Sequence, residues 1–243
     1  MISDRAIRSA LARFRLAAAA KDGTDPPREL EIILDASVSM TAGDGSKQEL
    51  GRELSIFLLR AAEAAGMAAR LVVLKGDGRD RVISTAESSR VTMIAFDGVR
   101  AFDEAVRQAV QAGTTGIGDA SRGALLRVVV SDFLFPDDPA PLVRTIAPER
   151  GRLWLVQLLA DEELNPMPAG RFALEDLETD ESVELVLDEA AIAGYRGRLN
   201  DLCQRLSASC RDAAASLSTV SAADGIEKLC ENSLVTAGLL VAH

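Results

Sequence analysis

One carboxylate and two hydroxyl side chains follow the first strongly apolar segment of this 243-residue chain. In "LEIILDASVSM", a largely apolar run at residues 30–34 ends at Asp35, and Ser37 and Ser39 follow at alternate positions. Hydroxyls two residues apart can both point inward from one loop. This spacing therefore predicts a cluster of oxygen ligands at the point where a buried strand reaches the surface.

A second apolar run ends in the same way. The segment "LLRVVVSDF" leads to Asp132, and the loop "QAGTTGIGD" before it carries Thr114 and Thr115. In a parallel α/β sheet, the loops at the carboxyl ends of the strands form the crevice where ligands bind, and right-handed crossovers bring these loops together. We therefore expect Asp35, Asp132 and a threonine hydroxyl to face one site.

Such a site favours the binding of a hard divalent cation. Mg²⁺ prefers six oxygen ligands in a tight octahedron and keeps some of its waters, while carboxylates can bind through water and orient the hydroxyls. A site with few directly bound negative charges leaves the ion electrophilic, so that it can bind a carboxylate of a partner. The predicted cofactor is Mg²⁺ or Mn²⁺, and the predicted metal-site residues are Asp35, Ser37, Ser39, Asp132 and a threonine, Thr114 or Thr115.

The elements that must position these residues alternate between strands and helices. Buried strands are predicted at residues 30–36 and in "ARLVVLKG", "LLRVVVSDF" and "RLWLVQLLA", with a strand near 82–84 and a loop or short strand at 91–96. Helical spacing predicts a helix at about 48–65, and another in "VRAFDEAVRQAVQAG", with Gly66 and Gly113 at their ends. Further helices are expected in "DDPAPLVRTIAPERG", "AIAGYRGRLNDLCQRLSASCRDAAASL" and "ADGIEKLCENSL", and a short strand in "STVS". This order predicts an α/β fold: a doubly wound, mainly parallel sheet with helices on both faces.

Two segments lie outside that alternation. Residues 1–27 are predicted to form a helical extension, whose Ile7, Leu11 and Phe14 pack on a single domain spanning residues 28–243. Within that domain, "FALEDLETDESVELVLDE" predicts a β-hairpin insertion at about residues 170–188, with its turn at 179–181.

The composition argues against several classes of protein. A net charge of −10 and a pI of about 4.8 disfavour binding to nucleic acid or to an anionic membrane, and no apolar run approaches the ~20 residues that span a bilayer. The only histidine is His243, which excludes Ser-His-Asp chemistry and most zinc sites. Three cysteines without a CxxC pair indicate a reducing compartment, and we expect a cytoplasmic protein.

The motifs resemble those of a known family. Asp35, Ser37 and Ser39 in "LDASVSM", Thr114 in "AGT" and Asp132 in "VVVSDF" are similar to the metal-ion-dependent adhesion site of von Willebrand factor A domains. The segments "LDASVSM…SKQELGRELSIFLLRAA" and "VVVSDFLFPDD", with the tail from "WLVQLLADEELNP" to "AGLL", resemble the bacterial family called domain of unknown function fifty-eight. The resemblance covers residues 28–241.

This resemblance implies a protein-binding domain that is not an enzyme. It implies that Ser37, Ser39 and Thr114 bind the metal directly, that Asp35 and Asp132 act mainly through water, and that an Asp or Glu of a partner completes the shell. In the family, the domain is usually encoded beside MoxR-type AAA+ ATPases and is thought to work with them as an adaptor or chaperone module. The implied partner is such an ATPase.

Two features depart from the family pattern. The family's usual Pro-Gly-Asp-Asp run and Ile-Asp-Trp tripeptide do not precede the first strand in this sequence. Only the seventeen residues 115–131 separate Thr114 from Asp132, so that a helix near "GDASRGALL" must be very short. Thr115 is therefore an alternative to Thr114 as a ligand.

Two other functions are compatible with the same residues. One is a domain of this fold with a vestigial metal site, which binds partners through other surfaces. The other is a Mg²⁺-dependent phosphoryl-transfer enzyme with Asp35 as its nucleophile, an arrangement similar to that of haloacid-dehalogenase-like enzymes. Those enzymes need a second aspartate where this chain has Ser37, which favours the binding domain.

Overall fold

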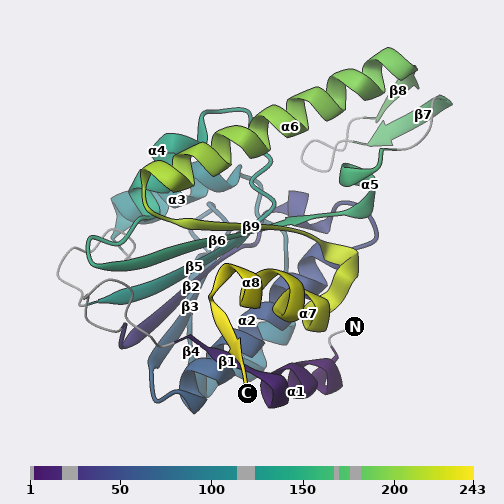
Figure 1. Ribbon diagram of the computed structural model, residues 1–243. Helices are drawn as coiled ribbons and strands as arrows, with labels where there is room; N and C mark the ends of the chain where they lie inside the picture. The colour runs from purple at the N-terminus through teal and green to yellow at the C-terminus, as the bar shows by residue number, and fades with distance from the viewer. Residues whose placement is uncertain (1–2, 18–26, 114–123, 167–169, 176–181) are drawn as a thin grey trace.

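The computed structural model describes residues 3–17, 27–113, 124–166, 170–175 and 182–243. Six strands form the central sheet: β2 (Glu29–Asp35), β3 (Ala68–Leu74), β4 (Arg81–Ser84), β5 (Leu125–Ser131), β6 (Gly151–Leu159) and β9 (Ser216–Ser221). Their order is β4-β3-β2-β5-β6-β9, and every neighbouring pair is parallel except β3 with β4 (Figure 1). The predicted strands are therefore present.

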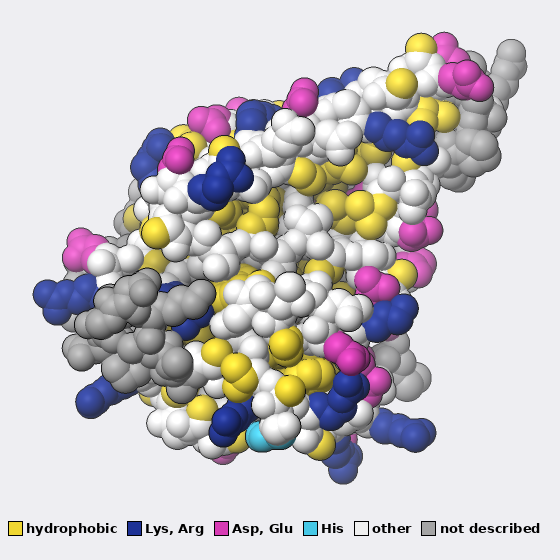
Figure 2. Space-filling model, viewed as in Figure 1, with side chains coloured by type: hydrophobic (Ala, Val, Ile, Leu, Met, Phe, Trp, Pro, Cys, Tyr) yellow, Lys and Arg dark blue, Asp and Glu magenta, His cyan; other side chains and the backbone are white. Residues whose placement is uncertain are grey.

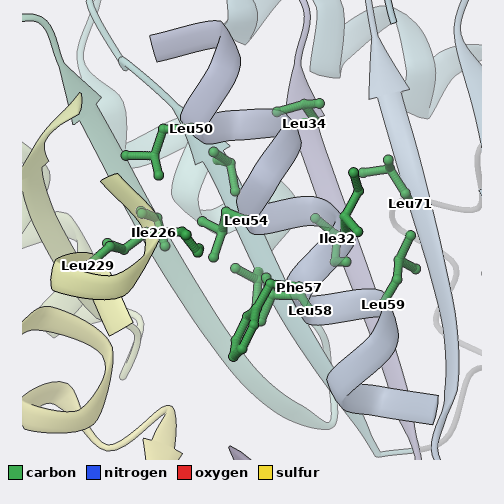
Figure 3. Close-up of a cluster of buried hydrophobic side chains, with 14 of the residues drawn as sticks. Ile32, Leu34, Leu50, Leu54, Phe57, Leu58, Leu59, Leu71, Ile226 and Leu229 are labelled. Carbon is green, nitrogen blue, oxygen red and sulfur yellow. The ribbon is translucent and has the colours of Figure 1, made fainter. Parts of the chain in front are cut away.

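Helices cover both faces of this sheet. On one face, Ile32 and Leu34 of β2 pack with Leu54, Phe57 and other residues of α2 (Ser46–Ala64), as Figure 3 shows. On the other face, Ile33 belongs to a second apolar cluster with side chains of α3 (Phe102–Ala112), α4 (Pro139–Ile146) and α6 (Glu189–Asp212). The alternation follows from the period of two in a strand. It confirms the predicted doubly wound α/β fold.

The two predicted glycine ends are confirmed. Gly66 follows α2 with a φ of 69°, and Gly113 ends α3 with a φ of 64°, a conformation that glycine adopts without a steric penalty. Of the loop or short strand expected at residues 91–96, the strand is wrong, and a loop begins at Ile94. Thr85–Met93 is a 3₁₀ helix instead, which begins with a capping box between Ser84 and Glu87.

Both ends of the chain pack beside α2. Helix α1 (Asp4–Arg13) buries Ile7, and strand β1 (Phe14–Leu16) pairs with β10 (Leu240–Ala242), a pairing that the sequence patterns did not predict. The predicted last helix, "ADGIEKLCENSL", is present as part of a continuous helical segment of mixed type. It runs from a 3₁₀ turn at Ala222–Asp224 through α7 (Gly225–Lys228) and a π-helical stretch to α8 (Val235–Ala237). Figure 1 places both termini on this side of the sheet.

A hairpin extends from the sheet after the short helix α5 (Asp161–Leu164). Its strands β7 (Gly170–Glu175) and β8 (Ser182–Leu187) are antiparallel, as predicted, while the predicted turn at 179–181 lies outside the described residues. Beyond the hairpin, α6 crosses the molecule, and Figure 2 shows basic and acidic side chains interspersed along it. None of the helices in the described ranges has the length and apolar character needed to cross a membrane.

Candidate metal site at the carboxyl edge of the sheet

The strand order reverses between β2 and β5. From β2 the chain crosses to β3 on one side, whereas β5 lies on the other side of β2. In open α/β sheets, ligands bind outside the carboxyl ends of the strands at such a reversal. Asp35 is the last residue of β2 and Asp132 directly follows β5, so the structure brings the two predicted carboxylates to this position.

Asp35 is a buried carboxylate with both oxygens engaged. Its Oδ1 accepts from the backbone N–H of Ser37 at 2.9 Å, and its Oδ2 accepts from the hydroxyl of Ser131 at 2.6 Å. Burial, followed by the negative charge of Asp132, raises the pKa of Asp35 to about 7. Asp35 thus orients the loop after β2, and a cation beside it would favour its charged form.

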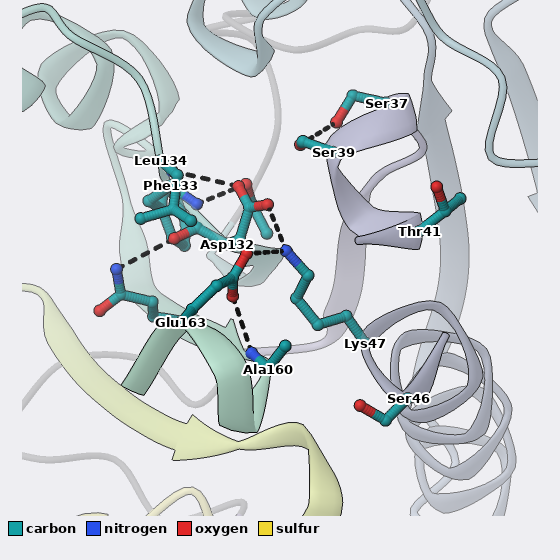
Figure 4. A network of polar contacts seen from close by, with 12 residues as sticks. Ser37, Ser39, Thr41, Ser46, Lys47, Asp132, Phe133, Leu134, Ala160 and Glu163 are labelled. Carbon is teal, nitrogen blue, oxygen red and sulfur yellow. Dashed lines mark hydrogen bonds and ion pairs between the residues drawn. The ribbon is translucent and has the colours of Figure 1, made fainter. Parts of the chain in front are cut away.

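Ser37 and Ser39 direct their hydroxyls toward each other from the turn that follows. Their Oγ atoms lie 2.9 Å apart (Figure 4), and Ser39 belongs to a 3₁₀ helix at Val38–Thr41. The edge of an octahedron with metal–oxygen distances of about 2.1 Å is about 3 Å long. The separation of the two hydroxyls therefore suits two adjacent ligands of a Mg²⁺-type ion.

Gly98 anchors the loop that carries these serines. The N–H of Val38 donates to the carbonyl of Gly98 at 2.9 Å, and the N–H of Gly98 donates to Ala36 at 3.0 Å. A Cβ at position 98 would lie 2.8 Å from the carbonyl oxygen of Lys75, so this close approach requires glycine.

Asp132 is held by its own turn and by β6. Its Oδ1 accepts from the N–H of Leu134 at 3.1 Å, and its backbone carbonyl accepts from Gln157 Nε2 at 3.0 Å. Phe133 adopts a φ of 53°, which is uncommon for a non-glycine residue. The other carboxylate oxygen, Oδ2, accepts from the ammonium group of Lys47 at 2.9 Å.

Lys47 was not among the predicted site residues. Its side chain is fully buried and also donates to Glu163 Oε1 at 2.6 Å, while Glu163 Oε2 accepts from the N–H of Ala160 at 2.7 Å (Figure 4). Burial lowers the pKa of Lys47, but the charges of Asp132 and Glu163 outweigh this effect and raise it above its ordinary value. Burial also raises the pKa of Glu163, against the attraction of Lys47. We assign a charged ammonium, because two carboxylates face it.

A signal for Lys47 was present in the sequence. Lys47 lies in the first turn of α2, where the helix dipole disfavours a cation. An acidic partner offsets this unfavourable effect, but the sequence does not say which residue supplies it. Glu163 and Ser131 carried no comparable signal.

The predicted threonine ligands cannot be placed. Thr114 and Thr115, and most of the segment "GDASRGALL" with its expected short helix, lie outside the described residues. Among the described residues, the candidate metal site consists of Asp35, Ser37, Ser39 and Asp132.

These donors fit a hard divalent cation. All of them are carboxylate or hydroxyl oxygens, the ligand type that Mg²⁺ and Mn²⁺ prefer. Within the described ranges, no three His, Cys, Asp or Glu side chains converge on a metal position. Lys47 is the feature that departs from an ordinary metal site, because it already neutralises part of the charge of Asp132.

No protein-family model matches the chain, and no curated protein sequence matches it. Among solved structures, it is similar to the conserved hypothetical protein BatB from Bacteroides thetaiotaomicron, with 15% identity, a TM-score of 0.47, and coverage of 86% of this chain and 98% of that one. An aerotolerance-related membrane protein from Bacteroides fragilis matches with 14% identity, a TM-score of 0.44, and coverage of 79% and 90%. The SpRpn10 VWA domain matches with 12% identity, a TM-score of 0.41, and coverage of 80% and 88%.

Proposed function

We propose that this chain is a protein-interaction domain that binds Mg²⁺ or Mn²⁺ at the ends of β2 and β5 and, through the metal, a carboxylate of a partner protein. One observation carries the proposal: the hydroxyls of Ser37 and Ser39 lie 2.9 Å apart at the strand-order reversal where Asp35 and Asp132 end their strands. Neutral hydroxyl ligands leave a divalent ion with a strong attraction for a further anion.

Each residue has a distinct part in this proposal. Ser37 and Ser39 would bind the ion directly, with Thr114 or Thr115 as a third hydroxyl ligand on the family resemblance. Asp35 and Asp132 would act mainly through water and orient the loops. When bound, the ion supplies a Lewis-acidic centre for an Asp or Glu of the partner.

The environment of Asp35 favours binding over phosphoryl transfer. A nucleophilic carboxylate must reach its substrate, but Asp35 is only 1% exposed and both of its oxygens accept hydrogen bonds. Ser37 stands where haloacid-dehalogenase-like enzymes need a second aspartate, and its hydroxyl is too weak an acid to replace that carboxyl group as a general acid. We therefore propose a non-enzymatic role.

The proposed partner is a MoxR-type AAA+ ATPase, and the proposed location is the cytoplasm. Both follow from the family resemblance of "LDASVSM" and "VVVSDFLFPDD" and from the composition of the chain. In this proposal the domain acts as an adaptor, and the ATPase supplies the carboxylate that completes the metal shell.

Calorimetric titration of Mg²⁺ and Mn²⁺ into metal-free protein tests the metal site. The wild-type chain should bind one ion, and the Ser37→Ala, Ser39→Ala double variant should lose that binding. Thr41→Ala is the matched control, because Thr41 lies on the opposite side of the same turn and bonds the carbonyl of Val38 at 2.7 Å (Figure 4). Equal binding by all three proteins would contradict the assignment.

A second titration tests the partner. A purified MoxR-type ATPase should associate with the domain in Mg²⁺ but not in EDTA, and the double serine variant should not associate. Association that is equally strong in EDTA would instead support the alternative of a vestigial metal site and binding through another surface.

A further inference from the structure

We propose that Lys47 is an internal cation that competes with the divalent ion for Asp132, whether that carboxylate meets the ion directly or through water, so that the ion binds more tightly when the ammonium group releases the carboxylate. This inference rests on the proposed function and concerns the regulation of the same site. It assigns to a buried lysine the control of metal affinity.

Lys47 directly contacts the carboxylate that a metal ion would use. Its side chain is fully buried, and its Nζ lies 2.9 Å from Asp132 Oδ2 and 2.6 Å from Glu163 Oε1. The opposite oxygen of Asp132 accepts from the N–H of Leu134. Both oxygens of Asp132 are therefore engaged before any metal arrives, and one of them is engaged by a positive charge.

Glu163 gives the ammonium group a second anchor. Its carboxylate is fixed by the N–H of Ala160 at 2.7 Å and comes from α5, an element separate from the strand end that carries Asp132. Lys47 can therefore give up Asp132 and remain paired with Glu163, so that no unpaired buried charge results. This arrangement makes the release of Asp132 feasible where loss of both partners would be prohibitive.

Two cations at this edge repel each other. A divalent ion held near Asp132 would lie close to the ammonium group of Lys47 in a buried environment, where charges interact more strongly than in water. The charges of Lys47, Asp132 and Glu163 add up to −1, and Asp35 lies at the end of the neighbouring strand. Removing the ammonium group should therefore strengthen metal binding, since it frees Asp132 and ends the repulsion.

Mn²⁺ titration of a Lys47→Met variant tests this inference, with binding followed by calorimetry and by the electron paramagnetic resonance signal of free Mn²⁺. We expect at least tenfold tighter binding than in the wild-type chain. Lys75→Met is the matched control, because Lys75 is a buried lysine at the end of β3 whose ammonium group pairs with Asp97, outside the site. This control should bind Mn²⁺ as the wild type does.

A second variant tests the same inference without leaving two buried carboxylates unpaired. Lys47→Met leaves two carboxylates without their cation, so the Lys47→Met, Glu163→Gln double variant removes one charge of each sign and keeps the net charge. Circular dichroism and thermal unfolding verify the fold of each protein before titration. The double variant should also bind Mn²⁺ at least tenfold more tightly than the wild type, because Asp132 is free in both.

The outcomes separate this inference from the proposed function. Tighter binding by the Lys47 variants supports the competition, and does so even if the wild type binds no metal, a result that would overturn metal dependence of the wild-type chain alone. Equal or weaker binding by both Lys47 variants, with wild-type binding intact, overturns the competition and leaves the proposed function standing. Absence of binding in every protein overturns both.

Discussion

Two clusters of buried charge lie along β2, and they are built in opposite ways. Near the amino end of the strand, one carboxylate, Glu31, lies in register between Arg70 of β3 and Arg127 of β5 and pairs with both. Near the carboxyl end, one ammonium group, Lys47, lies between the carboxylates of Asp132 and Glu163. The first cluster thus has one carboxylate between two cationic groups, and the second has one cationic group between two carboxylates.

The arginine cluster is fixed by the sheet itself. Its three residues occupy one register position on three adjacent strands, and Arg127 also donates to the carbonyl of Ile146. A planar guanidinium group matches a carboxylate in a rigid geometry. This cluster therefore ties β3, β2 and β5 together at a single register.

The lysine cluster joins three different elements and not neighbouring strands of one sheet. Lys47 comes from the first turn of α2, Asp132 from the turn after β5 and Glu163 from the short helix α5. Lysine is a point charge on a flexible stem, and its ammonium group can exchange partners more readily than a guanidinium fork. Buried charge therefore fixes the strand register at one end of β2, whereas at the other end the proposed function assigns it to the binding of a further cation.

Glu31→Gln should have the largest effect, because it removes the carboxylate of the arginine cluster. It leaves two guanidinium groups, one of them fully buried, without their shared carboxylate, and we expect a loss of about 3–5 kcal/mol in the free energy of unfolding. Urea denaturation measures this loss. Glu63→Gln, on the exposed end of α2, is the control and should change stability by less than about 0.5 kcal/mol.

The same variant must leave metal affinity unchanged if the two clusters are independent. A loss of stability below about 1 kcal/mol, or weaker Mn²⁺ binding by folded Glu31→Gln protein, would contradict the division into an architectural cluster and a binding cluster.

Asp35→Asn should remove a pH dependence of the free energy of unfolding that arises at the carboxyl end of β2. The pKa of Asp35 is raised to about 7 in the folded chain, above the value of 3.8 for a free side chain. Between these values the folded state binds more protons than the unfolded state. The contribution of Asp35 to stability is therefore complete at low pH and is lost as the pH rises through about 7. The metal-free wild type should lose about 2–3 kcal/mol more than the variant between pH 5 and pH 8.

Urea unfolding in EDTA at both pH values measures this difference. If the free energy of unfolding changed equally between the two pH values in the wild type and in Asp35→Asn, Asp35 would already be ionised without metal. Excess Mg²⁺ should reduce the pH dependence of the wild type, because a bound cation favours the charged carboxylate, and should leave the variant unaffected.

The parts of the fold that follow local patterns were predictable. The apolar runs that became β2 and β5 are short and bounded by polar residues, and the helical spacing of Leu50, Leu54 and Phe57 identified α2. Asp35 and Asp132 were predictable as neighbours, because both end such runs and the alternation of elements implies a parallel sheet. The mutual approach of the two serine hydroxyls followed from their spacing.

Contacts between distant segments that do not follow from the order of the parallel strands were not predictable. Lys47 and Glu163 are 116 positions apart, and nothing in either local sequence names the other as its partner. The pairing of β1 with β10 joins the two ends of the chain in the same way. The 3₁₀ helix at Thr85–Met93 has no strong apolar period, and its signal was the cap formed by Ser84 and Glu87.

The smallest expected effect is on the rate at which the cysteine thiols are modified. This rate distinguishes local unfolding near the lysine cluster from global unfolding caused by loss of the arginine cluster. Cys203 is half-buried, and its thiol bonds Gln157, which holds the carbonyl of Asp132. Burial raises the pKa of Cys210 to about 11 and that of Cys230 to about 12, so both are poor nucleophiles. Iodoacetamide at pH 8 should therefore modify Cys203 first, as peptide mass spectrometry can measure, and Cys203→Ser should remove the fast phase.

The variants sharpen this measurement. Glu31→Gln lowers the stability of the whole sheet, so it should speed the modification of all three thiols through global unfolding. Lys47→Met loosens only the turn that Gln157 supports, so it should speed the modification of Cys203 a few-fold and leave Cys210 and Cys230 unchanged. If both variants accelerated all three thiols equally, the lysine cluster would stabilise the fold in the same way as the arginine cluster, and the carboxyl end of β2 would have no independent freedom to exchange its cation.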